Sequence, residues 1–146
     1  MEIKFKKVHT GKDLILSALV LAAGIGLYFI HAGLGFLIAG CGILLLLFFK
    51  AGHKRVGADG PVLTKKAFDV AHSCRQNLKD FLDGKDVEPD VSAPGAGGVV
   101  RLEVYYNREA EVAYAQLFDF SSYTYEAATG VVELTGPRAV KLISKL

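Results

Sequence analysis

His72 and Cys74 are the first pair of residues in the chain whose types and spacing suit chemistry, because together they could supply two ligands to a metal ion. Protein metal sites need three or four ligands, and the chain after residue 50 offers only one more histidine, His53. We therefore expect no metal. Cys74 would begin a helix, where a thiol pKa can be depressed and the thiol made reactive; a small apolar side chain in the core is the alternative.

Hydrolytic and phosphate-binding chemistry both lack their sequence signatures. Ser121 and Ser122 lie outside any nucleophile-elbow motif, and no histidine follows residue 72 to act as a base. Residues 84–98 are rich in glycine, but a phosphate-binding loop leads from a strand into a helix and carries Lys-Ser/Thr. Here the loop precedes a predicted strand. The sequence thus predicts a protein that is not an enzyme and binds no cofactor.

With these chemistries disfavoured, the distribution of tyrosine is the remaining feature that could indicate function. Five of the six tyrosines fall between positions 105 and 125. Tyrosine favours strands, so sheet packing explains part of this bias, and strand parity places Tyr106 and Tyr114 in the core. Exposed tyrosines are typical anchors of protein and ligand contacts. We predict a partner surface made of the tyrosines that parity leaves outside the core: Tyr105, Tyr123 and Tyr125.

The elements that would position these tyrosines form a small α+β domain over residues 62–146. Alternating or two-sided apolar patterns predict strands at 62–70, 99–106, 111–120, 123–127 and 131–135. The strand at 111–120 is apolar at both parities, as expected of a central strand covered on both faces. Helices are predicted over 74–83 and from Pro137 onward, which gives a mostly antiparallel meander sheet with two helices.

Local signals set the ends of these elements. Ser73 and Gln76 match a capping box that would start the first helix with Ser73 as N-cap, and Gly84 would end it. Residues 128–130 (Ala-Thr-Gly) are predicted to form a three-residue hairpin loop with Gly130 at positive φ. Pro137 suits the first position of the last helix.

Residues 1–50 predict a membrane unit instead. From Leu14 to Phe49 the sequence has no acidic or basic side chain except His31. Two apolar stretches, at about 14–30 and 33–49, are each roughly 25 Å long as helices, near the lower limit for crossing a bilayer. We predict a transmembrane helical hairpin, followed by a polar juxtamembrane linker at 51–61. One continuous 36-residue helix is the competing interpretation, and a cleaved signal peptide is disfavoured because a second apolar segment follows directly.

Basic residues flank both apolar stretches and are missing from their connection. By the positive-inside rule both termini should be cytoplasmic. Two spans with a small cytoplasmic domain are common in bacterial membrane proteins, so we expect the inner (cytoplasmic) membrane. The basic side chains that set this orientation are Lys4, Lys6, Lys7 and Lys12 before the hairpin, and Lys50, Lys54 and Arg55 after it.

Small residues recur at helical spacing in both stretches and predict close packing of helix backbones. The expected packing residues are Ala18, Ala22 and Gly26 in the first helix, and Gly35 and Ala39 in the second. They could pack within one hairpin or between copies of the chain. Membrane lipid, a second copy or another membrane protein are therefore the expected partners.

Charge separates the two parts of the chain. Residues 1–84 carry eleven Lys/Arg and six Asp/Glu, whereas residues 85–146 carry six and nine. The acidic C-terminal half argues against nucleic acid as a partner. The sequence as a whole predicts a membrane-anchored cytoplasmic interaction module, or a small subunit of a membrane assembly. The alternative is a ligand-sensing membrane effector of the defence type that oligomerises through its hairpin.

Overall fold

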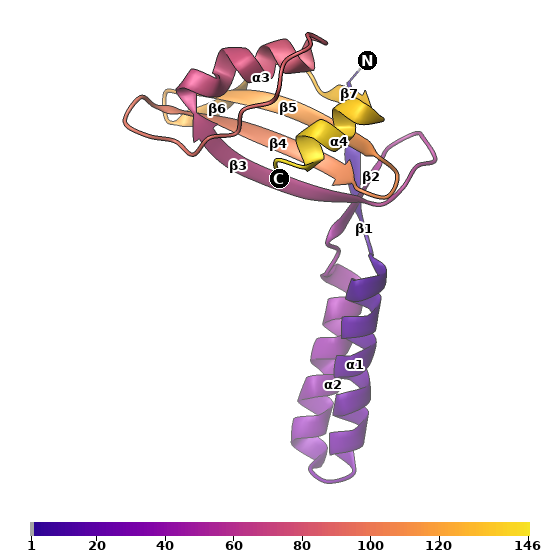
Figure 1. Ribbon diagram of the computed structural model, residues 1–146. Coiled ribbons are helices and arrows are strands. Elements are labelled where there is room, and N and C mark those ends of the chain that lie inside the picture. The colour runs from indigo at the N-terminus through magenta and orange to yellow at the C-terminus, as the bar shows by residue number, and fades with distance from the viewer. Residues whose placement is uncertain (1) are drawn as a thin grey trace. The chain divides into compact units, whose positions relative to one another are not determined.

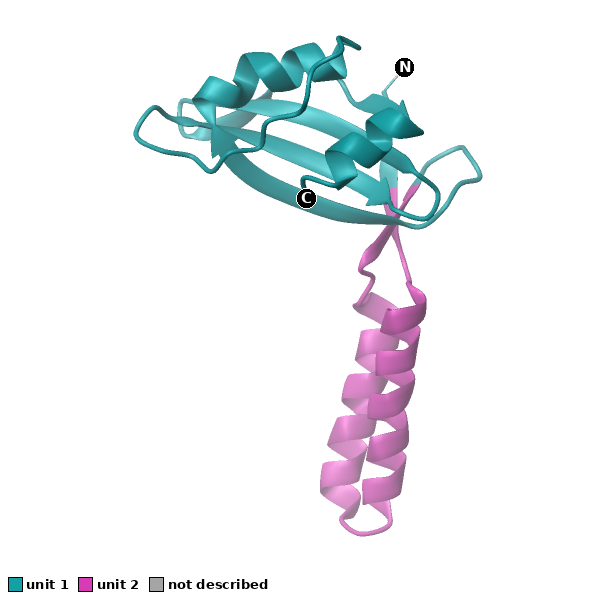
Figure 2. Ribbon diagram, viewed as in Figure 1, with its two compact units in different colours: residues 1–5, 55–146 teal, residues 6–54 magenta. Residues whose placement is uncertain are grey.

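A computed structural model describes residues 2–146 and has an α+β architecture (Figure 1). Among these residues there are four α-helices and a seven-stranded antiparallel sheet with strand order β1-β2-β3-β4-β5-β6, in which β7 pairs with β5. The chain divides into two compact units (Figure 2). One, the hairpin unit, is residues 6–54. The other, the sheet unit, combines the N-terminal segment up to Phe5 with everything from Arg55 onward.

The hairpin unit contains α1 (Gly11–Tyr28) and α2 (Ala32–Phe48), which pack along each other. The chain turns between them, so the alternative of one continuous helix is wrong. His31 is the N-cap of α2, where its Nδ1 accepts a hydrogen bond from the Leu34 N–H at 3.2 Å. α1 is long and apolar enough to cross a membrane, a property that it shares with signal sequences, whereas α2 is a shorter apolar helix of 17 residues.

A capping box begins α1, which the sequence analysis did not anticipate. The Thr10 hydroxyl accepts the Asp13 N–H, and the Asp13 carboxylate accepts the Thr10 N–H at 3.1 Å. The same carboxylate accepts the N–H of Ala51 at 2.8 Å. Asp13 is 5 % exposed, and it therefore fastens the start of α1 to the chain that leaves α2.

Glycine allows α1 and α2 to approach closely. A methyl group at Gly42 would lie 2.7 Å from the Leu21 nitrogen, and one at Gly24 or Gly35 would collide with the facing backbone of Ala39 or Tyr28. No heavy atom of a neighbour lies within 4 Å of a methyl group at Gly26. Ala18, Ala22 and Gly26 are exposed and do not take part in the contact within the hairpin, whereas Gly35 and Ala39 do lie at that contact; packing of the α1 stripe between copies stays a prediction. The predicted stripe and the residues of α1 that contact α2 lie on different faces of the same helix, a fraction of a turn apart. Sequence spacing alone does not show which face meets α2.

The sheet unit is built on the antiparallel strands β3 (Leu63–Ala71), β4 (Val99–Asn107) and β5 (Val112–Ser121). Two helices, α3 (Arg75–Leu82) and α4 (Pro137–Ile143), cover one face of the sheet (Figure 1). The main core lies between them and that face. It contains Val100, Leu102 and Val104 of β4, Leu78 and Phe81 of α3, and Ala139 and Leu142 of α4. This confirms the predicted inward parity of β4 and the predicted apolar faces of both helices.

Two short strands were not predicted: β1 (Phe5–Val8) and β2 (Gly52–Arg55). Their basic residues led to their assignment as membrane flanks, and the prediction of a linker over 51–61 is wrong for the part that β2 occupies. Four-residue strands carry too short an alternation to be distinguished from a polar flank. The segment at 84–98 does contain no regular helix or strand, in agreement with the predicted loop.

The predicted N-cap of α3 is also wrong. Residues His72–Cys74 form a 3₁₀ turn that leads directly into α3, so Ser73 lies inside a helical turn and Cys74 occupies the cap position without a side-chain hydrogen bond. The Gln76 amide instead donates to Asp80 at 2.9 Å. Such 3₁₀ turns are common at helix ends, and they move the first helical residue away from the capping signature.

The predicted hairpin between residues 123–127 and 131–135 does not form. β6 (Thr124–Ala127) pairs with residues 118–121 of β5, and β7 (Val132–Thr135) pairs with residues 112–115 of the same strand. The two strands thus follow one another along a single edge of β5. Residues 128–131 interrupt them, and positive φ is found at Gly136 but not at Gly130.

The glycine contact predicts opposite effects for two alanine substitutions. Gly35→Ala should lower the thermal unfolding midpoint in detergent, because its methyl group would lie 2.7 Å from the Gly24 carbonyl oxygen and closer still to Tyr28. Overpacking of this kind costs about 1–3 kcal/mol. Gly26→Ala is the matched control and should leave the midpoint unchanged or raise it, because alanine favours helices and the position is open. Circular dichroism measures the two unfolding midpoints. Equal shifts of the midpoint in the two variants would contradict the packing.

Candidate functional site

The face of the sheet opposite α3 and α4, here called the helix-free face, carries the tyrosines singled out by the sequence. Alternation along the strands places Lys65 and Asp69 of β3 on this face, together with Arg101, Glu103 and Tyr105 of β4. From β5 it receives Tyr114, Gln116, Phe118 and Phe120. The helix-free face is therefore a mixed aromatic and charged surface, and aromatic residues and arginine are enriched in protein contact surfaces.

Phe5 of the N-terminal segment covers part of this face. Its ring is stacked on Tyr105 with centroids 3.9 Å apart and planes 10° apart, and it meets Tyr114 edge to face at 5.4 Å. The prediction that Tyr105 is an open anchor is therefore wrong. Tyr114 is 8 % exposed and lies in a second apolar cluster with Leu63 and Val112, as its expected role in stability requires. No local pattern relates Phe5 to Tyr105, because the two lie 100 residues apart in the sequence.

A cavity of about 170 Å³ opens beside these rings and is partly enclosed. Ile3 and Phe5 form its N-terminal wall, and strands β4 and β5 form its floor. Its lining combines apolar, aromatic and polar groups: Ile3, Phe5, Tyr105, Tyr114, Val131, Glu103 and Gln116. The Gln116 amide donates to the carbonyl of Thr129 at 3.0 Å, which fixes its orientation.

Tyr125 belongs to a separate polar cluster on the helix-free face. Its hydroxyl donates to Asp69 at 3.1 Å, Arg101 donates to the same carboxylate oxygen at 3.2 Å, and the Arg101 guanidinium lies 3.9 Å from the centre of the Tyr125 ring. Burial and the hydrogen bond to Asp69 raise the pKa of Tyr125. Tyr125 is therefore held in place by neighbours, with part of its ring accessible.

Tyr123 is the exposed tyrosine that the sequence predicted. It is 98 % exposed and lies with Ser122 in the two-residue turn between β5 and β6, where both residues have positive φ. This conformation matches the turn type that joins tight antiparallel strands. Phe120, which packs near Tyr125 at a ring distance of 5.1 Å, is 48 % exposed. Phe120 and Tyr123, which are exposed, and Tyr125, which is partly exposed, lie within six residues at the β5–β6 turn and are here called the β5–β6 patch.

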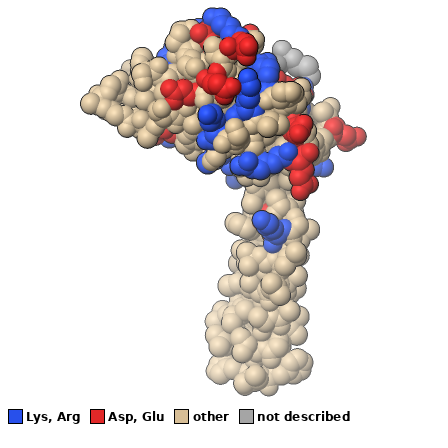
Figure 3. All heavy atoms as spheres, viewed as in Figure 1, with Lys and Arg blue, Asp and Glu red and all other residues tan. Residues whose placement is uncertain are grey.

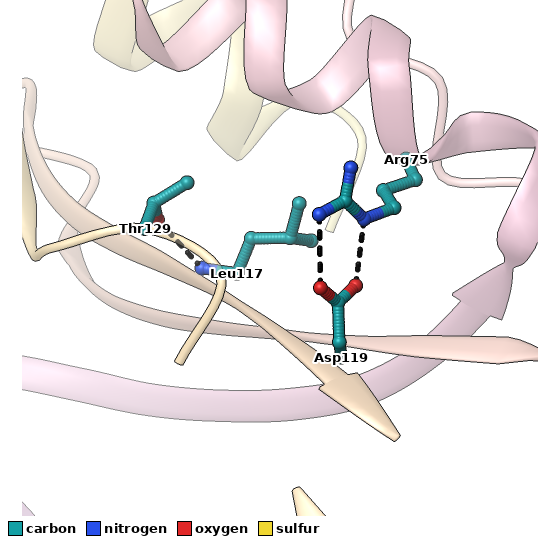
Figure 4. Close-up of polar contacts among 4 residues, drawn as sticks. All are labelled: Arg75, Leu117, Asp119 and Thr129. Carbon is teal, nitrogen blue, oxygen red and sulfur yellow. Dashed lines mark hydrogen bonds and ion pairs between the residues drawn. The ribbon is translucent and has the colours of Figure 1, made fainter. Parts of the chain in front are cut away.

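Polar contacts on the opposite face are structural (Figure 4). Arg75 at the start of α3 binds Asp119 of β5 through two hydrogen bonds of 2.7 and 2.9 Å, and these lower the pKa of Asp119. Where β6 and β7 are interrupted, the hydroxyl of Thr129 accepts the N–H of Leu117 at 3.2 Å. A side chain thereby replaces the missing strand partner.

The cysteine considered for reactive or metal chemistry lies apart from these surfaces. Cys74 is 2 % exposed and lies in the main core, so the interpretation as a core side chain fits its position. Within residues 2–146, no group of three or more His, Cys, Asp or Glu side chains is placed to hold a metal ion.

The loop at 84–98 is held against α3 by the side chain of Asn77. Its amide oxygen accepts the Asp90 N–H at 2.8 Å, and its amide nitrogen donates to the Glu88 carbonyl at 2.9 Å.

Comparisons of the chain with protein-family models, with curated proteins and with solved structures found no match.

The Arg75–Asp119 pair predicts a specific dependence of stability on pH. A carboxyl whose folded pKa is depressed stabilises the fold above its unfolded pKa, about 3.9 for aspartate, and this contribution disappears as the pH falls through the folded pKa. At pH 6, Asp119→Asn should therefore reduce the free energy of unfolding by about 0.5–1 kcal/mol, a modest amount because the pair is partly exposed. The difference between the variant and the native chain should shrink toward pH 3.

Thermal unfolding of the full chain in detergent at several pH values measures this difference. Asp59→Asn is the matched control, since Asp59 is an exposed aspartate outside the strands and helices, and it should behave like the native chain throughout. A constant difference between Asp119→Asn and the native chain from pH 6 to pH 3 would show that the ion pair does not stabilise the fold.

Proposed function

We propose that the chain is a non-enzymatic, membrane-anchored interaction module whose hairpin unit spans the bilayer and whose sheet unit works in the cytoplasm. The observation that carries the proposal is the apolar surface of the hairpin. Fourteen large hydrophobic side chains of α1 and α2 are more than 40 % exposed, among them Leu19 at 63 %, Phe36 at 73 % and Phe48 at 77 %. Contiguous exposed apolar surface of this extent calls for a membrane or a partner.

The two helices support this proposal jointly. A lone N-terminal apolar helix could equally be a signal sequence, but α1 packs along α2 through three glycines. On the face shown in Figure 3, most of the hairpin surface carries no Lys, Arg, Asp or Glu. A cleaved signal would not need a second, closely fitted apolar helix. At 17 residues, α2 measures roughly 25 Å, within the range of short spans.

The Lys/Arg flanks define the expected orientation. Single-cysteine variants in a background without Cys41 and Cys74 should react with a membrane-impermeant maleimide at position 32, in the connection between α1 and α2, from outside the cell. Positions 5 and 146 should react only after the membrane is opened. The positive-inside rule is the physical reason for this pattern. External labelling at position 146 would overturn the proposed orientation, and labelling of all three positions would overturn insertion.

The β5–β6 patch is the proposed contact surface of the sheet unit. Tyr123, on the two-residue turn, and Phe120, near the end of β5, are exposed aromatic side chains, and aromatic side chains lose little conformational freedom on binding because they have few rotatable bonds. Tyr125 lies beside them and is oriented by Asp69 and Arg101. The patch retains two of the three tyrosines that the sequence singled out, and Phe120 replaces Tyr105.

A paired experiment tests the patch. A photo-cross-linking phenylalanine analogue at position 123 should give one discrete adduct in cells, whereas the same analogue at the exposed control position 109 should give none. Tyr123→Ala should leave the thermal midpoint unchanged and should abolish the adduct formed from position 120. Tyr105→Ala should instead lower the free energy of unfolding by about 1–3 kcal/mol, because it removes the partner of Phe5. Identical adducts at positions 123 and 109 would contradict a specific surface.

The second candidate function is a ligand-sensing effector that assembles through its hairpin. Two observations favour it: the partly enclosed cavity beside Phe5, and the outward position of Ala18, Ala22 and Gly26 on α1, which leaves these small residues accessible to a second copy. The two functions differ in one measurable property, since only an effector changes its assembly state when a ligand binds.

A further inference from the structure

The cavity beside Phe5 has the size of a small functional group. Its volume of about 170 Å³ lies below the range of about 300–1,000 Å³ found for drug-sized ligands and near the volume of about 150 Å³ that holds a benzene molecule in an engineered cavity. A whole nucleotide or a peptide segment would not fit inside. An occupant of some six to eight non-hydrogen atoms would.

Aromatic rings dominate the walls. Phe5, Tyr105 and Tyr114 all line the cavity, and their stacked and edge-to-face contacts hold them in one rigid cluster. The face of an aromatic ring is electron-rich and attracts cations, and clusters of such rings form the known cages for quaternary ammonium groups. Rigid rings need no reorganisation to accept such a ligand.

The single ionisable carboxyl in the lining gives the cavity its charge preference. Glu103 is 23 % exposed at its side chain and lies next to Tyr105 on the same strand. The ammonium group of Lys65 already lies 3.8 Å from this carboxylate and 5.5 Å from the centre of the Tyr105 ring. Lys65 is not among the residues that line the cavity, but its position shows that the Glu103 carboxylate and the Tyr105 ring together attract an ammonium group. At 3.8 Å the contact is loose, so a ligand can replace it.

One arginine, Arg55, also lies near the cavity, but its charge does not oppose the binding of a cation. Arg55 lies over Tyr114 at 5.7 Å, but it is bound to Glu133 at 3.1 Å, which neutralises it. From these contacts we propose that the cavity binds a small organic cation of the alkylammonium class, with the ammonium group between Glu103 and the rings of Tyr105 and Tyr114. Ile3 and Val131 contact its alkyl groups.

Choline is the probe, and 3,3-dimethylbutan-1-ol, which has the same shape without the charge, is its matched control. The full chain in a maltoside detergent is titrated with each and followed by calorimetry and by the methyl NMR signals of Ile3 and Val131. Choline should bind and shift both signals, and the neutral alcohol should bind at least about tenfold more weakly. Equal binding of the two, or binding that leaves both signals unmoved, would overturn the proposal.

Two substitutions test the charges separately. Glu103→Gln should weaken choline binding about tenfold or more, since it removes the carboxylate. Lys65→Met should strengthen choline binding, because it removes the competing ammonium group. Thermal midpoints identify any variant that fails to fold, and in that event the comparison of choline with the neutral alcohol on the native chain decides the question. Unchanged affinity in a folded Glu103→Gln variant would overturn the role of the carboxylate.

The same cation can come from solution or from a lipid headgroup, and nanodiscs distinguish the two sources. If phosphatidylcholine nanodiscs reproduce the Ile3 shift without added choline, the ligand is a headgroup. If phosphatidylcholine and phosphatidylglycerol nanodiscs give the same spectrum and only added choline moves the signal, the ligand is a free molecule. Failure of choline to bind in any of these settings would overturn the proposal, and it would leave the β5–β6 patch and its cross-linking test unaffected.

Discussion

The two-sided burial of β5 is the constraint on which the sheet unit depends. Ala113, Ala115 and Leu117 face the helices, whereas Val112 and Tyr114 face the other way and are also buried. A strand of this kind needs cover on both faces, since each large apolar side chain left in water forgoes about 1.5–3 kcal/mol. The helices α3 and α4 cover one face. Ile3 and Phe5 supply the cover on the other, and this cover also creates the cavity.

The course of most of the sheet unit could be predicted from the sequence. Clean alternation in β4, two-sided apolarity in β5 and the proline that opens α4 are local signals, and the structure confirms each of them. The failures were non-local. β6 and β7 both pair with β5, and between them the Thr129 hydroxyl accepts the Leu117 N–H. Contacts between residues so far apart leave no signal in the local sequence pattern. Ser73 is not the N-cap because the 3₁₀ turn begins at His72, one residue before it.

The candidate site was only partly predictable for the same reason. Tyr123 is exposed because it lies in a tight turn, and the serine pair before it marked a break in the strand pattern. Parity correctly put Tyr105 on the face opposite the main core, but parity does not say whether a second layer covers that face. The covering residue, Phe5, lies in a basic segment whose charges suited a membrane flank. In the hairpin, small residues correctly indicated close packing, but only the backbone geometry distinguished Gly24 from Gly26.

The sheet unit is discontinuous in sequence, because its first strand residue, Phe5, precedes the hairpin and the remainder begins at Arg55. The hairpin is in effect an insertion within a domain. A ribosome releases residues 3–5 long before β4 and β5 exist, so the N-terminal segment has to wait until the strands that it covers have been synthesised. Removing the hairpin by simple truncation would therefore also remove one wall of the second apolar cluster. A version without the hairpin that keeps this wall would have to be a circular permutant, with residues 2–5 joined after the C-terminus, or a chain in which a short turn replaces residues 9–51.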